Sequence, residues 1–222
     1  YYSALSPSVS ATPKAPATGG SGGGGGYTPP VKEEPVVEEP ADKEPVITET
    51  ETPGLNDISG HWAQNYIEHL VKKGAITGYP DKSFQPDATI TRAEFAVVLV
   101  KAFGLSGEGK VFADTAAHWA KEYIATAAAH GIILGYNEKE FGPDDSITRE
   151  QMAIMIVKAA GLEAGSGETG FTDKTDISPW AREWVLAAVS NDLISGYPDN
   201  SFKPQNNASR AEAVTVVFNA LK

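Results

Sequence analysis

The chain has no cysteine among its 222 residues, so it can form no disulfide and has no thiol for catalysis or metal binding. No stretch approaches the ~18 consecutive apolar residues of a membrane-spanning helix, and we expect no membrane span. Basic residues are also few, since 18 lysines and arginines stand against 29 acidic residues, a net charge of −11. Without a basic stripe to neutralise phosphates, we expect no nucleic-acid partner.

The first 52 residues contain too little apolar surface to offset the entropy of ordering the chain. A glycine-rich run at 19–26 precedes an acidic, proline-rich tract at 31–51. We therefore predict a disordered linker over residues 1–52, flexible in its first part and extended in its second. The sequence begins with Tyr1 rather than methionine and shows no signal-peptide pattern, so we expect a carboxy-terminal fragment whose cargo precedes Tyr1.

The rest of the chain repeats itself three times. Tryptophans at 62, 119 and 180 are separated by 57 and then 61 residues. Gly-Tyr pairs, prolines and arginines keep the same two intervals. Such a period predicts a supersecondary unit that stacks with its copies. We predict one domain with approximate threefold symmetry, divided into units 53–108, 109–168 and 169–222.

Each unit is predicted to be a helix, a turn-rich loop and a second helix. The first helix begins at the tryptophan and carries one apolar stripe, so we expect the tryptophan to be a core residue. Gly74 and Gly131 end this helix in two units, and Asp192 stands in their place in the third. The second helices, at 95–103, 152–160 and 213–221, are apolar nearly all round. They predict a mainly α fold with a central three-helix bundle.

A hydroxyl residue and an arginine stand at the start of each second helix. The hydroxyl residue and the residue three positions later fit the capping box S/T-x-x-E/Q. These pairs are Thr91 with Glu94, Thr148 with Gln151 and Ser209 with Glu212. Capping does not explain the arginine between them. The helix dipole moreover disfavours a cation at this position by ~0.3–1 kcal/mol. Its retention in all three units indicates a compensating anion.

Two sources for that anion stay open. One is a carboxylate of the protein, either upstream of the tryptophans or in the loops. The other is an external anion held by free helix amides together with the guanidinium group.

The first unit carries Asp57, His61–Ala63, the loop GYPDKSF at 78–84, Pro86 and TRAE at 91–94, in that order. This combination resembles the S-layer homology (SLH) domain from end to end, and the other two units match it more loosely. The resemblance implies a monomeric pseudo-trimer built around a three-helix spindle. It also implies non-covalent anchoring of an exported protein to the secondary polysaccharide of a Gram-positive cell wall, and hence a secreted, wall or S-layer location.

In the SLH family the ligand is typically a sugar, often N-acetylmannosamine, that bears ketal-linked pyruvate. The arginine of TRAE contacts it in grooves between adjacent units. The resemblance thus implies a ligand-binding set of arginines, cap hydroxyls, tryptophans and upstream aspartates, with no catalytic residue, metal or cofactor. The tryptophans would stack on sugar faces if they are not in the core. The set is Arg92, Arg149, Arg210, Thr91, Thr148, Ser209, Trp62, Trp119, Trp180, Asp57, Asp114 and Asp173.

Three other functions are less favoured by the sequence. An enzyme would need a unique catalytic cluster, but no G-x-S-x-G, H-E-x-x-H or P-loop occurs. The catalytic part of a parent enzyme would precede Tyr1. Calcium binding would need the D-x-[DN]-x-[DN]-G spacing, which the loops lack. Lattice formation by the module itself is the third alternative.

Overall fold

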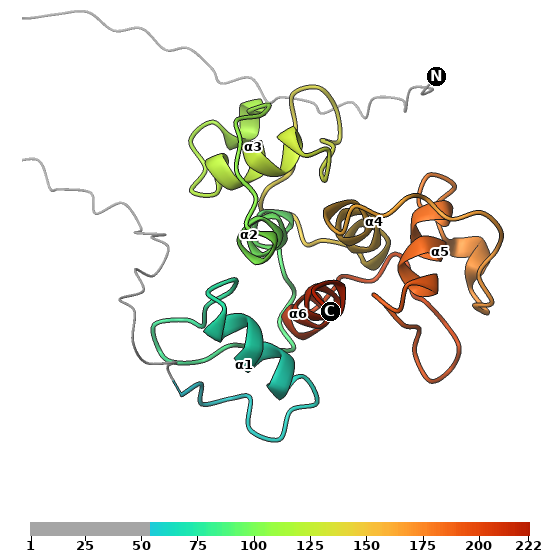
Figure 1. Ribbon diagram of the computed structural model, residues 1–222, viewed down its shortest axis with the longest axis horizontal. Coiled ribbons are helices and arrows are strands. Elements are labelled where there is room, and N and C mark those ends of the chain that lie inside the picture. Colours follow the sequence, from blue (N-terminus) through green and yellow to red (C-terminus); the bar gives the residue numbers. More distant parts are fainter. Residues whose placement is uncertain (1–53) are drawn as a thin grey trace, which may run out of the picture. The chain divides into compact units, whose positions relative to one another are not determined.

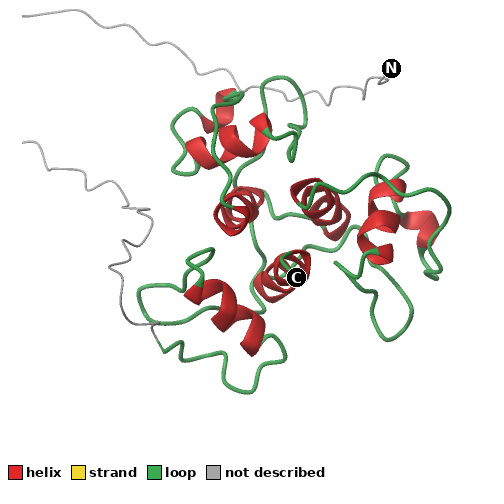
Figure 2. Cartoon of the chain, in the orientation of Figure 1, coloured by secondary structure: helices red, strands yellow, loops and turns green. Residues whose placement is uncertain are grey.

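The computed structural model describes residues 54–222, so the predicted linker over 1–52 lies outside the described residues. Within 54–222 the regular structure is helical, with no β-strand (Figure 2). Two short 3₁₀ turns occur at Ala113–Thr115 and Lys174–Asp176. The mainly α prediction is confirmed. The α-helices are α1 Gln64–Lys72, α2 Arg92–Phe103, α3 Lys121–Ala129, α4 Arg149–Ala159, α5 Arg182–Ser190 and α6 Arg210–Ala220.

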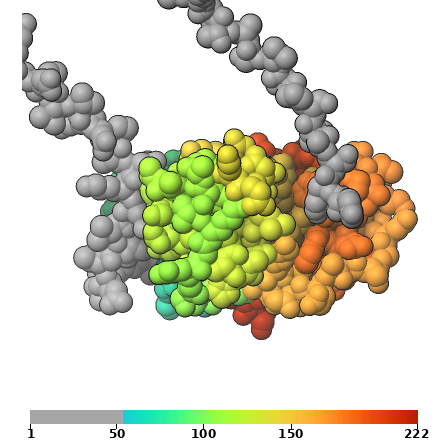
Figure 3. Space-filling view, turned by 90° about the horizontal axis from the view of Figure 1, so that it is seen from above, coloured from blue at the N-terminus to red at the C-terminus, as the bar shows by residue number. Residues whose placement is uncertain are grey.

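The second helix of each unit lies at the centre of the domain. Figure 1 shows α2, α4 and α6 side by side, with α1, α3 and α5 around them, and each inner helix contacts the other two. Figure 3 shows the second and third units side by side on one face. Most side chains of α2 are buried, including Phe95 and Leu99 at 0% exposure. The predicted central bundle is confirmed, because a helix that is apolar all round needs partners on every side.

Each inner helix packs against the outer helix of the next unit. The contacting pairs are α2 with α3, α4 with α5 and α6 with α1 (Figure 1). The last pair joins the end of the chain to the first helix and closes the ring. Each sequence repeat contains one outer and one inner helix. The helices that pack their apolar faces together, however, come from two successive units.

Three backbone segments meet where the inner helices begin. The Ile90 amide donates to the Ala208 carbonyl at 3.1 Å, the Ala208 amide to the Ile147 carbonyl at 2.9 Å, and the Ile147 amide to the Ile90 carbonyl at 3.0 Å. All three residues are fully buried. This closed triangle of hydrogen bonds sets the amino ends of α2, α4 and α6 together, so the positive ends of their dipoles lie at the same end of the bundle.

The outer helices begin two residues later than predicted. The tryptophans lie in the preceding turn and remain exposed, at 59% for Trp62, 39% for Trp119 and 49% for Trp180. The prediction that they are core residues is wrong. The buried residue at the helix start is the alanine that follows each tryptophan, at 0% exposure in all three units. Helical periodicity does not apply in the turn, so the large ring points outward.

The ends of the outer helices follow the prediction. Gly74 and Gly131 adopt left-handed backbone conformations, with φ of 74° and 68°. Asp192 takes the same conformation at φ 56° although it has a Cβ atom. The structure therefore needs a left-handed residue here in every unit, and the third unit supplies it at a steric cost that glycine avoids.

Candidate functional site

The contact between the start of one inner helix and the next unit will be called a junction. The first junction joins the start of α2 to the second unit, the second joins α4 to the third unit, and the third joins α6 to the first unit. All three predicted capping boxes are present at these starts. In the first, the Thr91 hydroxyl accepts from the Glu94 amide at 3.1 Å, and a Glu94 oxygen accepts from the Thr91 amide at 2.8 Å.

The helix amides at each junction are already hydrogen-bonded. The Arg92 amide donates to the Asp145 carbonyl at 2.9 Å and the Ala93 amide to the Pro143 carbonyl at 3.0 Å. Equivalent carbonyls of the next unit serve the starts of α4 and α6. The idea that free helix amides hold an external anion is therefore wrong. The acceptors come from the loop of another unit, 50–57 residues away along the chain for α2 and α4 and 122–125 residues away for α6, which local sequence patterns do not reveal.

Each arginine side chain inserts into the loop of the next unit. Arg92 is 5% exposed, and its Nε and Nη2 groups donate to the carbonyls of Phe141 at 3.0 Å and Leu134 at 3.4 Å. Its guanidinium carbon lies between two aromatic rings, 4.5 Å from the Tyr136 centroid and 4.6 Å from that of Phe141. Cation–π contact and charge-assisted hydrogen bonds thus fasten the loop to the neighbouring helix.

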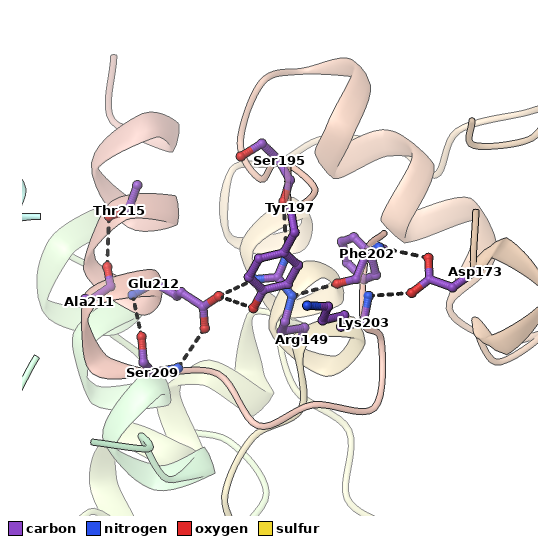
Figure 4. Close-up of polar contacts among 10 residues, drawn as sticks. All are labelled: Arg149, Asp173, Ser195, Tyr197, Phe202, Lys203, Ser209, Ala211, Glu212 and Thr215. Carbon is purple, nitrogen blue, oxygen red and sulfur yellow. Dashed lines mark hydrogen bonds and ion pairs between the residues drawn. The ribbon is translucent and has the colours of Figure 1, made fainter. Parts of the chain in front are cut away.

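The second junction has the same geometry (Figure 4). Arg149 donates to the carbonyls of Phe202 at 2.8 Å and Ser195 at 3.0 Å, and it lies between the rings of Tyr197 and Phe202. The Tyr197 hydroxyl donates to Glu212 at 2.8 Å. In the third junction, Arg210 binds the carbonyls of Phe84 and Thr77 and lies between Tyr79 and Phe84.

The remaining partner of each arginine is the capping residue of the next unit. Arg149 Nη1 pairs with Glu212 at 2.5 Å and Arg210 Nη1 with Glu94 at 3.4 Å. Arg92 Nη1 instead donates to the neutral amide oxygen of Gln151 at 3.2 Å. The capping residue therefore serves its own helix and a neighbour's arginine at once. A glutamate or glutamine at the third helical position was the available sequence signal, but capping alone accounted for it.

The pKa of the Arg92 guanidinium is set mainly by its burial. Burial lowers the pKa of its guanidinium from the ordinary value, while Tyr136, Asp145 and Asp114 raise it. Burial also raises the pKa of the Tyr136 hydroxyl, against the effect of Arg92. In residues 54–222, Arg92 makes no ion pair.

The upstream aspartates hold the loops rather than the arginines. Asp57 accepts from the amides of Phe84 and Gln85 at 2.8 and 2.7 Å. Asp114 and Asp173 make the equivalent bonds in their own units. Within residues 54–222, none of these three aspartates forms an ion pair with an arginine, so the carboxylates that pair with Arg149 and Arg210 are glutamates.

The loops also require glycine before the tyrosine. A Cβ atom at Gly78 would lie 2.7 Å from the Ser83 carbonyl oxygen, and one at Gly196 would lie 2.8 Å from that of Ser201. Only glycine permits this approach of the two loop arms without a shift of the backbone. The loop that receives the arginine is thus shaped by the aspartate and the glycine together.

Two of the tryptophans lie next to a histidine that contacts the loop receiving an inner helix. The His61 ring is 5.4 Å from the Trp62 ring, and its Nε2 contacts Asp87 at 3.3 Å. Asp87 lies between Pro86 and Ala88, whose carbonyls accept the first amides of α6. His118, Trp119 and Asp144 repeat the arrangement at the first junction. The first and third junctions therefore each have a buried arginine from one unit and an exposed tryptophan in the next. At the second junction Trp180 follows Ser178, which contacts Glu150 of α4.

The fold and the junctions define a threefold helical repeat module, fastened by arginines and bearing exposed tryptophans. A family model described as the S-layer homology domain matches residues 54–96, 111–153 and 170–214. The chain belongs to the S-layer homology domain family, as the resemblance predicted.

Relatives include both enzymes and surface proteins. An amylopullulanase of Thermoanaerobacterium thermosulfurigenes is 35% identical over 76% of this chain and 9% of its own length. The S-layer protein EA1 of Bacillus anthracis is 32% identical over 72% of this chain and 19% of its own. A cellulosome-anchoring protein of Acetivibrio thermocellus is 34% identical over 66% and 35%. The chain thus matches only a minor part of each relative. The cell-surface location expected from sequence is confirmed.

Two further properties concern residues 54–222 alone. Their helices are too short and insufficiently apolar to cross a bilayer. Their His, Asp and Glu side chains form no cluster of three or more suited to a metal ion.

Proposed function

We propose that this module anchors an exported protein non-covalently to the bacterial cell wall by binding an anionic wall polysaccharide at its junctions. The observation that carries the proposal is that each of the three contacts between units has a buried arginine from one unit and an exposed tryptophan in the next. The cation attracts a carboxylate, and the flat indole face accommodates the apolar face of a sugar ring.

The acidity of the chain favours a local site over a general attraction to polyanions. The net charge is −11, so the long-range field opposes an anionic polymer. Within that field, the positive dipole ends of the three parallel inner helices lie at one end of the bundle, where the arginines also lie. Binding there requires short-range contact with the guanidinium and the ring.

The finer proposal is that the ligand is pyruvylated. A ketal-linked pyruvate adds one carboxylate to an otherwise neutral sugar, which is the combination that a guanidinium beside an indole can recognise. Thr91, Thr148 and Ser209 act indirectly, because their hydroxyls cap the helices that position the arginines. The aspartates likewise position the loops. We further propose that the module is a non-catalytic monomer, and that the anchored cargo lies in other parts of the protein, as in the enzyme and S-layer relatives.

The test is calorimetry of the full 222-residue chain against purified wall polymer, before and after chemical removal of pyruvate. We expect saturable binding to intact polymer and a loss of at least tenfold in affinity after depyruvylation. A matched variant replaces Trp62, Trp119 and Trp180 by alanine. Because these rings are exposed, the variant should keep its melting temperature and lose affinity.

The outcomes separate the parts of the proposal. Equal affinity for both polymers would refute recognition of pyruvate and leave binding to the sugar backbone. Unchanged affinity in the tryptophan variant would show that the indole rings do not contact the polymer. No binding to intact polymer would refute anchoring through this ligand and favour lattice formation by the module.

A further inference from the structure

The three junctions share one geometry but differ in charge. Arg92 faces the neutral Gln151, whereas Arg149 and Arg210 face Glu212 and Glu94. The arginines themselves are equivalent, at 5%, 3% and 4% exposure. The partners are partly buried, with side-chain exposures of 18% for Glu212 and 27% for Glu94. A carboxylate so placed neutralises the guanidinium much more effectively than one in open solvent.

The second junction carries an additional negative group. Glu150 stands where the other helices have Ala93 and Ala211, and it is 2% exposed. Its carboxylate accepts from the Ser178 amide at 3.0 Å, the Ser178 hydroxyl at 2.8 Å and the Gln205 side chain at 2.9 Å. This cluster spans α4 and the third unit, where the other junctions have a histidine–aspartate contact.

The three substitutions that create this cluster occur together. Glu150 replaces alanine, Ser178 replaces Gly60 and Ala117, and Gln205 replaces the aspartate after the proline. A buried carboxylate is stable only when its oxygens are hydrogen-bonded, and the new partners supply those bonds. At the second junction, the Glu150 carboxylate therefore joins α4 to the third unit by hydrogen bonds that the other two junctions lack.

The three junctions can be ranked by the net charge of their buried and partly buried groups. The first has one positive charge from Arg92, the third has a neutral Arg210–Glu94 pair, and the second has a net negative charge. Exposed carboxylates also occur nearby, and water and salt screen them. At the first junction these are Asp144, which contacts His118, and Asp145 and Asp114, which lie near Arg92.

We propose that the first junction is the anion-binding junction of this module and that residue 151 and its equivalents set which junctions accept an anionic sugar. This inference rests on the proposed function and narrows it to one site with one ligand carboxylate. Three of the five N–H groups of Arg92 donate to Phe141, Leu134 and Gln151, and the remaining two would donate to the ligand carboxylate. Glu94 weakens the third junction, and Glu212 with Glu150 closes the second to anions.

The test is NMR titration of the full chain labelled with ¹⁵N. It follows the four tryptophan indole N–H signals, which single Trp→Phe variants assign. Trp119, Trp180 and Trp62 report the first, second and third junctions, and Trp184 is the internal control. The probe is a methyl glycoside of N-acetylmannosamine bearing ketal-linked pyruvate, with the glycoside lacking pyruvate as its control. We expect the pyruvylated probe to shift the Trp119 signal at concentrations at least tenfold below those needed at Trp62, with no shift at Trp180.

Isosteric variants then test the cause. Gln151→Glu keeps the cap and adds the missing carboxylate, so the Trp119 response should weaken at least tenfold. Glu94→Gln should strengthen the Trp62 response by a similar factor. Glu212→Gln leaves Arg149 and Glu150, a neutral junction like the third, so Trp180 should then respond about as weakly as Trp62. Equal responses at all three junctions, or a Trp119 response unchanged in Gln151→Glu, would overturn the inference while leaving the proposed function intact. A module that binds wall polymer but gives no indole shift with the probe would overturn both the inference and recognition of pyruvate.

Discussion

The buried arginines are expected to be major contributors to stability, and Arg149→Met tests this most directly. Arg149 is 3% exposed, is paired with Glu212 and donates to two loop carbonyls of the next unit. Methionine retains an unbranched apolar stem of similar length but offers no donor. The substitution therefore removes the hydrogen bonds and the charge while leaving most of the packing volume filled.

The expected loss is about 3–5 kcal/mol in the free energy of unfolding. Removing one partner of a buried ion pair costs about this much, because the other charge stays behind without compensation. The carbonyls of Phe202 and Ser195 also lose a donor, at about 1–3 kcal/mol for each that water cannot reach. Glu212 keeps its bonds from Ser209 and Tyr197, so its share of the loss is reduced and the total stays near the stated range.

The assay is urea denaturation of the full chain at pH 7, followed by circular dichroism at 222 nm. Arg182→Met is the matched control, since Arg182 is exposed at the start of the outer helix α5 and donates to the Ile177 carbonyl alone. It should change stability by no more than about 0.5 kcal/mol. A loss below about 1 kcal/mol for Arg149→Met would refute the view that the arginine fastens the units. Such a small loss would also show that water can hydrogen-bond to the carbonyls of Phe202 and Ser195 in the variant.

Three smaller effects should follow from the loops and helix ends. Asp192→Gly relieves a left-handed residue with a Cβ atom, and should raise the free energy of unfolding by up to about 1 kcal/mol in the same urea assay. Asp57→Ala removes two charge-assisted bonds to loop amides, and should lower it by about 2–4 kcal/mol; no loss would show that the loop holds without its aspartate. Hydrogen bonds from Ser83 hold the pKa of Asp81 below its ordinary value of 3.8, so the resulting stability is present above pH 3.8 and is lost as the pH falls through the lower folded value. Ser83→Ala should flatten this acid loss in a pH titration, and an unchanged profile would contradict that origin.

Patterns within a few residues determined much of this protein. Nearly unbroken apolar runs marked the inner helices, and apolar residues at helical spacing marked the outer ones, because a helix repeats every 3.6 residues wherever it lies. The capping boxes marked their starts, because the cap and its partner are three residues apart. The spacing of tryptophans and arginines defined three units and the family, since recurrence is visible without any knowledge of contacts.

Local patterns misplaced the tryptophans. The apolar stripe was extended back to Trp62 as though the helix had begun, whereas the helix starts at Gln64 and the ring lies in the turn before it. Alternation predicts a buried face only where the backbone is helical. The alanine that follows each tryptophan is the buried residue instead, and a small side chain gives a weak hydrophobic signal in the sequence.

Only the tertiary structure decided what the arginines contact. Arg210 binds the carbonyl of Phe84, 126 residues earlier in the chain, because the closing of α6 on α1 brings them together. The sequence required a compensating partner for a cation at a helix start, but it left a choice between the protein and a ligand. Packing of each inner helix against the following unit supplied carbonyls, aromatic rings and a capping side chain. Such contacts depend on how the units pack around the central bundle, which no pattern confined to one unit contains.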